Sequence, residues 1–251
     1  MEYFKFFPKT LYIFGDESTT SGSGNVVTEV FTDISAYSEV VDQVRKNTAF
    51  HTKYYIQENE RPDQTSLKLY GTTSYHWTFS YMNDHLRSSG WPVNNKQLDR
   101  IVKRDFPHTV FTTTQDLTRY MLPGQIVIGS TSGARGKVIR RKLDLGQIII
   151  EQLGTTKFSS TEVITGTNLS AVSTQSVLGN SVLEYNAVHH YENSDGEYVD
   201  IDPRVGPGAL LTAVTNYDRY IKRNDELKSI TVIKSQNVNE VASLFRQAMQ
   251  K

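Results

Sequence analysis

The segment GSTSGARGK, residues 129–137, comes closest to a known catalytic or nucleotide-binding motif. A phosphate-binding loop needs Gly, four residues, Gly-Lys and then Ser or Thr, because the loop amides hold the phosphates and the hydroxyl holds magnesium. Here Thr131 stands at the first Gly position and Val138 follows Gly136-Lys137. A nucleophile elbow needs Gly-x-Ser-x-Gly between a strand and a helix, but Thr131 is central and strands are predicted on both sides. The segment therefore predicts a hairpin turn.

A basic cluster lies in and after this turn and could contact phosphates. Nucleic-acid-binding surfaces combine such clusters with an excess of positive charge and interleaved aromatic residues. This cluster has no interleaved aromatic residue, and the chain has 27 Lys plus Arg against 27 Asp plus Glu. We therefore expect a solvated or subunit-bridging hairpin and no nucleic-acid partner. The cluster consists of Arg135, Lys137, Arg140, Arg141 and Lys142.

The histidines and carboxylates show no recognisable catalytic pattern. No two of the six histidines have the i, i+4 helical spacing of a zinc site with a carboxylate nearby. His189 and His190 should point to opposite faces of a strand. A lysozyme-like pair of carboxylates would be invisible in sequence, but the acidic residues of the central segment stand in no catalytic context. We expect no enzyme, and we assign no catalytic, metal-binding or cofactor-binding residue and no cofactor.

Composition indicates a globular chain. Its 251 residues, 37% of them hydrophobic, can bury a core as one large domain or two smaller ones. Cysteine is absent, which excludes disulfide frameworks, thiolate zinc sites and cysteine nucleophiles. No apolar run reaches the length of a membrane span, and the first residues lack the apolar core of a signal peptide. We expect a soluble protein made in the cytoplasm, with no membrane partner.

The first fifty residues predict an aromatic arm, a flexible tract and a helix. Phe4, Phe6 and Phe7 begin the arm, and the Ser/Thr/Gly tract of residues 18–25 follows it. The arm either folds back on the protein's own core or docks on a neighbouring subunit, and we expect docking. From Asp33 an apolar stripe predicts a helix, with Arg45 and Lys46 at its C-terminal end.

Residues 54–92 predict a strand, two short helices and a return of the chain. The strand covers residues 54–56, and Pro62 in the first turn begins a helix that ends at Gly71. The second helix carries aromatic residues at helical spacing, and Gly90, Trp91 and Pro92 turn the chain back. A further helix runs to Pro107.

From residue 109 the pattern changes to short β-type runs separated by glycine turns. Runs at residues 110–114, 125–128, 137–140, 147–151 and 162–165 predict a small β-barrel or sandwich. A polar connection over residues 166–180 should lead to two more strands, at residues 181–191 and 197–201.

The last forty residues return to a helical pattern. Residues 209–229 predict one amphipathic helix with Leu210, Val214, Tyr217 and Ile221 on one stripe. Residues 229–234 predict a strand that either offers an edge to a partner or closes the protein's own sheet. Residue 237 should begin the last helix, whose apolar face includes Phe245. Of these residues, we assign Tyr217, Ile221 and Phe245 to partner binding, together with Phe4, Phe6 and Phe7.

Three separated segments resemble one family. They are FKFFP with TDISAY near the start, RPDQTSLKLYGTTSYHWTFSYMND with GWP in the centre, and DRYIKRNDELKSITVIKSQNVNEVASLFRQAMQ at the end. In this order they resemble the baseplate wedge protein of contractile-tailed, T-even-type bacteriophages, whose core is LysM-like. The resemblance covers roughly the first hundred and the last sixty residues, so the middle reads as an insertion.

The resemblance implies a fold class and a division of the chain. The fold would be α+β: a LysM-like strand-helix-helix core with an N-terminal arm and helix, an inserted small β-barrel or sandwich, and C-terminal amphipathic helices. The segments would be residues 1–48 (arm and helix), 49–107 (LysM-like core), 108–186 (inserted β domain) and 187–251 (hairpin and C-terminal helices). The core residues would be Tyr55, Leu67, Tyr70, Trp77, Asn83 and Trp91.

The resemblance also implies a function. The chain would be a structural virion protein of the tail baseplate, assembled in the host cytoplasm, that joins neighbouring wedges around the hub. Its partners would be other wedge proteins, the sheath-initiating protein and neighbouring copies in a sixfold ring. Two alternatives stay open: a LysM-type module that binds peptidoglycan or chitin, and the anchor of a cell-wall hydrolase.

Overall fold

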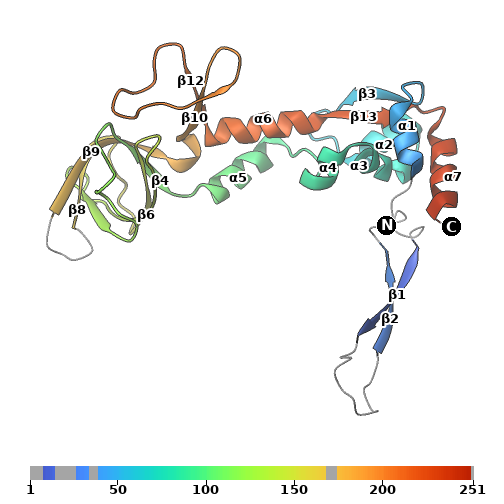
Figure 1. Ribbon diagram of the computed structural model, residues 1–251, viewed down its shortest axis with the longest axis horizontal. Coiled ribbons are helices and arrows are strands. Elements are labelled where there is room, and N and C mark those ends of the chain that lie inside the picture. Colours follow the sequence, from blue (N-terminus) through green and yellow to red (C-terminus); the bar gives the residue numbers. More distant parts are fainter. Residues whose placement is uncertain (1–7, 15–26, 34–38, 168–173, 250–251) are drawn as a thin grey trace. The chain divides into compact units, whose positions relative to one another are not determined.

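The computed structural model describes residues 8–14, 27–33, 39–167 and 174–249. The fold is mixed α+β (Figure 1). Contacts divide the chain into two compact units, Met1–Val93 with Asp225–Lys251, and Asn94–Asn224. The sequence predicted four consecutive segments. The first unit instead combines residues from both ends of the chain.

The first unit contains a two-stranded antiparallel sheet whose strands come from distant parts of the sequence. Strand β3 (His51–Tyr55) pairs with β13 (Ser229–Ile233), and Tyr54 lies opposite Ile230. The predicted 229–234 strand therefore closes the protein's own sheet. The helices of this unit are α1 (Glu39–Lys46), α2 (Pro62–Tyr70), the 3-10 turn η2 (Thr73–Tyr75), α3 (Trp77–Met82), α4 (Asp84–Ser89) and α7 (Val238–Met249).

Local sequence signals fix the ends of α2. Pro62 occupies the first turn, and the Gln64 side chain accepts a hydrogen bond from the Arg61 backbone N–H at 3.0 Å. Gly71 ends the helix with φ of 72°, a left-handed conformation that a residue with a Cβ disfavours. These are the signals from which the helix was predicted.

Two apolar clusters cover the helices of the first unit. In one, Phe79 and Leu86 pack with Ile56 on the β3 side and with Ile230 and Val232 of β13. In the other, residues of α3 pack with residues of α1, β13 and α7; its buried members are Val44, Tyr81, Met82, Ile233, Val238, Val241 and Phe245. Strand β13 therefore contributes to both clusters.

Asn83 joins α3 to strand β13. Its side-chain amide donates to the backbone carbonyls of Phe79 and Thr231, both at 2.8 Å, and its carbonyl oxygen accepts from the Thr231 N–H at 2.8 Å. The side chain is buried. Because buried backbone groups need partners, the Asn83 side chain satisfies the Thr231 backbone in the two-stranded sheet, and the Phe79 carbonyl also accepts from the Asn83 backbone N–H at 3.1 Å.

A β-hairpin precedes α1. Strands β1 (Lys9–Phe14) and β2 (Val27–Thr32) pair antiparallel, with Leu11 opposite Val30. Among the described elements, these two strands pack extensively only on each other. The sequence predicted an arm here but no hairpin, and the predicted tract of residues 18–25 lies outside the described residues.

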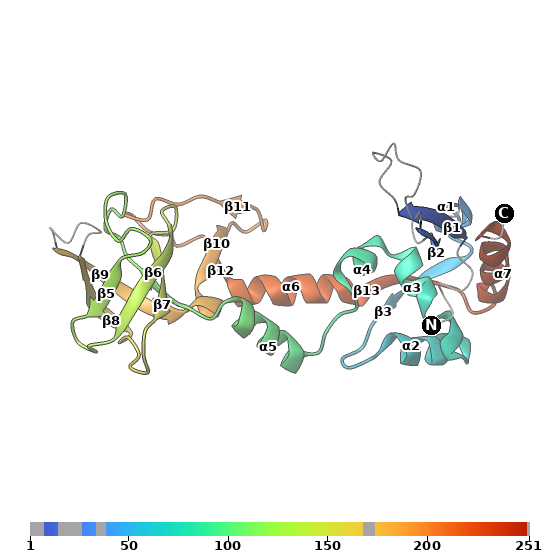
Figure 2. The same cartoon turned by 90° about the horizontal axis from the view of Figure 1, so that it is seen from below.

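The second unit contains a closed six-stranded β-barrel with strand order β4-β7-β6-β5-β8-β9 (Figure 2). Alternate residues of its strands point inward, and the interior is filled by residues such as Phe111, Val127, Ile148 and Ile164. The strands are β4 (Thr109–Thr112), β5 (Ile126–Gly129), β6 (Arg135–Lys142), β7 (Gln147–Gln152), β8 (Thr161–Thr167) and β9 (Thr174–Leu183).

Strand β9 corrects the prediction of a polar connection over residues 166–180. Its first residues are polar, but Val177 alternates inward into the barrel and the strand pairs with β8 along its length. The Ser/Thr-rich composition marks a strand with one solvent-facing side, which periodicity alone did not reveal.

The rest of the second unit combines helices with a small sheet. Helix α5 (Asn95–Asp105), predicted from the sequence, precedes the barrel. After the barrel come η3 (Glu184–Asn186), β10 (Val188–Glu192), β11 (Tyr198–Val199), β12 (Thr212–Thr215) and α6 (Asn216–Lys228). The sequence predicted helix from residue 209, but Thr212–Thr215 pairs with β10, so the helix begins at Asn216.

We expect Asn83→Ala to lower the free energy of unfolding by about 2 to 4 kcal/mol, because it removes a buried side chain and leaves the part-buried Thr231 N–H and carbonyl of β13 without these partners. Urea titration followed by circular dichroism measures the loss. Gln236→Ala, which removes an exposed amide from the same unit, is the matched control and should change stability by less than about 0.5 kcal/mol. A loss for Asn83→Ala no larger than the control's would contradict this role.

Candidate functional site

The motif-like segment at residues 129–137 is a hairpin turn, as predicted. It joins the antiparallel strands β5 and β6. The buried carboxylate of Glu162 on β8 accepts hydrogen bonds from the backbone N–H groups of Thr131 (3.1 Å), Ser132 (3.0 Å) and Ser159 (2.7 Å), and from the Ser132 hydroxyl. A Cβ on Gly129 would lie 2.4 Å from a Glu162 oxygen, so this position requires glycine.

The carboxylate of Glu162 therefore holds the turn. Burial raises the pKa of this carboxyl, but the hydrogen bonds from Ser132, Ser159 and Thr131 outweigh burial and bring the pKa below its ordinary value. A depressed pKa in the folded state means that the ionised form stabilises the fold. That contribution is present above the unfolded-state pKa of about 4.3 and is lost as pH falls through the folded-state pKa.

We expect Glu162→Gln to destabilise the second unit by about 1.5 to 3 kcal/mol near neutral pH, because charge-assisted hydrogen bonds are lost. The difference from the wild type should shrink as pH falls below about 4, where the wild-type carboxylate also becomes protonated. Urea titrations over this pH range measure both effects. Glu151→Gln, at an exposed carboxylate of β7, is the control; an equal loss in both variants would contradict the assignment.

Two adjacent histidines begin a second polar cluster in the same unit. The Nδ1 atoms of His189 and His190 are 3.0 Å apart, and His190 Nε2 lies 3.1 Å from the Glu192 carboxylate. Lys222 of α6 donates to the same carboxylate at 3.3 Å, and the His190 ring stacks on Tyr198. The prediction of opposite faces is wrong, because a bulge between Val188 and His190 shifts the register with β12 and re-aims the side chains.

The cluster has a consistent proton assignment. If the Nε2–H of His190 donates to the Glu192 carboxylate, the Nδ1 atom of His190 is an acceptor. The Nδ1–H of His189 then donates to the Nδ1 atom of His190. Burial lowers the pKa of His189 to about 4, and the positive charges of Arg219 and Lys142 act in the same direction, with Asp144 opposing them. His189 is therefore neutral near pH 7. This chain of contacts ties β10 to α6.

Stability of the second unit should fall as pH falls from about 6.5 toward 4, because the unfolded chain takes up a proton at His189 that the folded chain excludes. We expect His189→Gln to flatten this dependence and to raise stability near pH 5 by about 1 kcal/mol relative to the wild type, after allowance for solvent screening. Urea titrations at about pH 7.5 and 5 measure the change. The control is His85→Gln at an exposed histidine; flattening in both variants would contradict the assignment.

The residues assigned to the LysM-like core fall into two groups. Four of them lie inside or against the apolar clusters: Tyr70, Trp77, Asn83 and Trp91. The Tyr70 hydroxyl donates to the Ile233 carbonyl at 3.0 Å, and the Trp91 ring N–H donates to the Glu60 carbonyl at 2.7 Å. The other two, Tyr55 and Leu67, are more than half exposed.

Alternation explains the exposure of Tyr55 and Leu67. Tyr54 takes the inward position on β3, so its neighbour Tyr55 points outward. On α2, Leu69 and Tyr70 pack against the apolar cluster, whereas Leu67 is 54% exposed. These two residues therefore form part of the surface of the first unit and not of its core.

The residues assigned to partner binding are also divided. Phe4, Phe6 and Phe7 lie outside the described residues. On α6, Tyr217 is half-buried and Ile221 is exposed. Phe245 is 2% exposed, and its ring lies 4.8 Å from that of Trp77 and 4.7 Å from that of Tyr81. Its apolar stripe on α7 is therefore used within the chain.

The largest exposed apolar residues near the N-terminus lie on the β1–β2 hairpin. Leu11 and Val30, which face each other on one side, are 67% and 60% exposed. On the other side Tyr12 is 57% and Phe31 45% exposed, with ring centroids 6.2 Å apart. Sequence analysis missed this hairpin, although two runs of β-branched and aromatic residues flanking a Gly/Ser tract are a hairpin signal.

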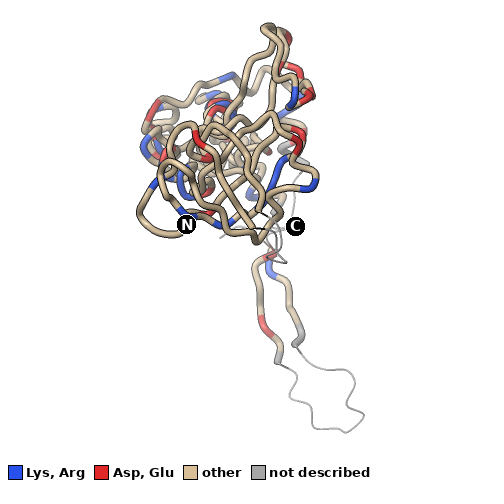
Figure 3. Tube along the Cα trace, turned by 90° about the vertical axis from the view of Figure 1, so that its left-hand side faces the viewer, with Lys and Arg blue, Asp and Glu red and all other residues tan. Residues whose placement is uncertain are grey.

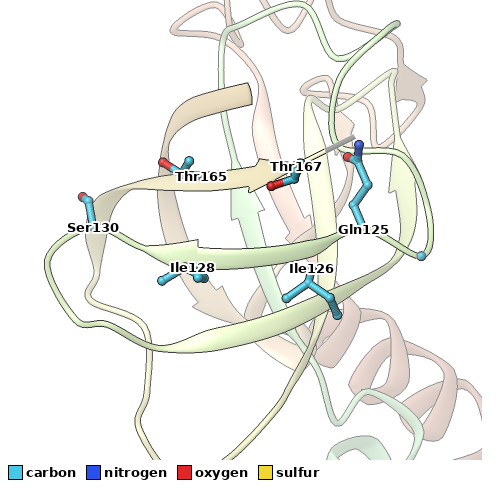
Figure 4. Close-up of a pocket in the computed structure, with 7 residues that line it drawn as sticks. Gln125, Ile126, Ile128, Ser130, Thr165 and Thr167 are labelled. Atoms are coloured by element: carbon cyan, nitrogen blue, oxygen red, sulfur yellow. The ribbon is translucent and has the colours of Figure 1, made fainter. Parts of the chain in front are cut away.

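An open groove of about 590 Å³ lies on the outer side of the barrel, over β5 and β8 (Figure 4). Ile126 and Ile128 of β5 and Thr165 and Thr167 of β8 line it, with Ser130 at one end. Both isoleucines are exposed, since the alternate residue Val127 points into the barrel. No acidic or basic side chain lines this groove, so it has the composition of a contact surface and not of an acid-base site.

Comparison with protein-family models and with curated proteins finds no match to this chain. Within the described residues, no three His, Cys, Asp or Glu side chains are grouped so that they could hold a metal ion. Of the helices that the structure describes, none combines the length and the apolar character needed to cross a membrane.

Proposed function

We propose that the chain is a structural subunit of a contractile phage-tail baseplate that joins neighbouring wedges around the hub. The observation that carries this proposal is the common folding of two distant segments that resemble the wedge protein. The central segment forms α2, η2, α3 and the first residue of α4, and the C-terminal segment supplies β13 and α7, which complete the same unit. Both clusters of that unit contain residues from both segments.

The topology of the first unit supports a LysM-like core. Its order is strand, helix, helices and strand, with β3 and β13 as an antiparallel pair and α2 and α3 between them in sequence. The returning strand follows residues 94–224, the unit that contains the β domain of residues 108–186, and we propose this β domain as the insertion.

The contacts inside the core favour a scaffold over a sugar-binding module. Trp91, Tyr70 and Asn83 use their polar groups on backbone atoms of the same unit. The Trp91 ring also packs on Phe79, with centroids 5.8 Å apart. Such side chains stabilise the core and are not displayed for stacking on a saccharide. The alternatives of a peptidoglycan-binding or chitin-binding module and of a hydrolase anchor therefore receive less support.

The proposed partners are other wedge proteins, the sheath-initiating protein and neighbouring copies in a sixfold ring, and the proposed location is the virion baseplate after assembly in the host cytoplasm. A zero net charge fits a protein that meets other proteins. Acidic and basic residues are interspersed along the described trace (Figure 3). Neither nucleic acid nor a membrane is proposed as a partner.

We expect the tagged chain to co-purify with the wedge proteins and the sheath-initiating protein when all are expressed together from one T-even-type phage. In parallel, peptidoglycan pull-down should leave the chain in the supernatant, with an authentic LysM protein as the positive control. Chitin oligomers should leave the fluorescence of its 2 tryptophans unchanged. A saturable fluorescence shift together with failure to co-purify would overturn the proposal in favour of the sugar-binding module.

A further inference from the structure

The β1–β2 hairpin exposes large apolar side chains to solvent. A two-stranded hairpin is at best marginally stable alone, and its outer edges present unpaired backbone groups. Here apolar side chains are exposed on both faces, with Leu11 and Val30 on one and Tyr12 and Phe31 on the other. Most of the described hairpin carries no charged residue (Figure 3). Its composition is therefore that of a segment which a partner covers.

One face of the hairpin combines aromatic residues with a single acidic group. Glu29 lies directly opposite Tyr12, and Phe31 is the next residue of β2 on the same face. Glu29 is exposed and makes no ion pair within the described residues. A surface that fits this face should offer apolar side chains beside a positive charge.

The groove on the barrel and the strand β6 beside it together offer that combination. Two basic residues of the neighbouring strand β6 lie directly opposite the two isoleucines: Arg135 opposite Ile128 and Lys137 opposite Ile126. Both basic side chains are exposed, and neither forms an ion pair with a described residue. Glu151 lies opposite Lys137 on β7, so Arg135 is the less compensated of the two. On the β8 side the groove has only hydroxyls, from Thr165 and Thr167.

We propose that the β1–β2 hairpin of one copy of this chain docks on the outer groove of the barrel of a second copy. Tyr12 and Phe31 would cover Ile126 and Ile128, and Glu29 would lie against Arg135 and Lys137. The contact joins two different surfaces, so each copy carries one of each and can bind a neighbour on either side. Such head-to-tail contacts form rings or filaments. The identification of the neighbouring copies as adjacent wedges rests on the proposed function. The self-association itself does not depend on the proposed function.

Charge reversal on each surface tests the contact without removing its apolar residues. The wild type should self-associate by sedimentation velocity at low salt as concentration rises toward about 100 μM, a range that covers weak interfaces. Glu29→Lys alone, and Arg135→Glu with Lys137→Glu, should each weaken association about tenfold or more. Circular dichroism establishes that each variant is folded.

Mixing the two variants identifies the geometry. Each hairpin then meets a barrel of opposite charge on the other variant, so association should return in the mixture. Glu226→Lys and Lys157→Glu, which reverse exposed charges elsewhere, are the controls and should associate like the wild type. A wild type that stays monomeric, a barrel variant that associates normally, or a mixture that stays monomeric would each overturn the proposal. Co-purification with wedge proteins is measured separately and can succeed while this contact fails.

Discussion

The pairing of β3 with β13 is the constraint on which the first unit depends. The two strands lie on either side of the whole second unit in sequence, yet Ile56 and Phe79 share one buried cluster with Ile230 and Val232. Bringing such distant strands together costs chain entropy that local helix formation cannot repay. Asn83 adds hydrogen bonds to both α3 and the Thr231 backbone, so it stabilises the same long-range junction. The helices of residues 62–89 therefore share their core with β13, a strand that follows the whole second unit in sequence.

In the second unit, buried carboxylates hold local structure together in the places where catalysis might have been sought. Glu162 satisfies the backbone of the β5–β6 turn, and Glu184 pairs with Arg140 and accepts from the His108 N–H. The Glu184 carbonyl also accepts from the Asn216 side chain at the start of α6. For Glu162, the donated hydrogen bonds hold the pKa of the carboxyl below its ordinary value, so the ionised form is the one that the fold binds. The burial and the contacts of the two carboxylates therefore indicate structural roles.

The sequence predicted elements well where the signal was local. The limits of α2 follow from Pro62, Gln64 and Gly71, and the hairpin turn at residues 129–137 follows from its glycines. The sequence did not predict the features that depend on contacts with residues distant in the chain. Residues 212–215 were predicted as helix, but they pair with β10 as a strand. Tyr55 was predicted as a core residue, but it lies on the outward face of β3. Phe245 was predicted to bind a partner, but Trp77 and Tyr81 of the same chain cover it.

The distribution of apolar residues separates the interior from the surfaces left for partners. Phe245 of α7, which the sequence assigned to partner binding, is buried within the first unit, whereas Leu11 and Val30 of the hairpin and Ile126 and Ile128 of β5 are exposed. In a chain of zero net charge, no overall repulsion keeps such surfaces apart. Because Glu29 on one surface and Arg135 with Lys137 on the other carry opposite charges, their pairing is favoured over the pairing of either surface with itself. Specificity in assembly would then come from a few charges, and the area of contact from the apolar side chains around them.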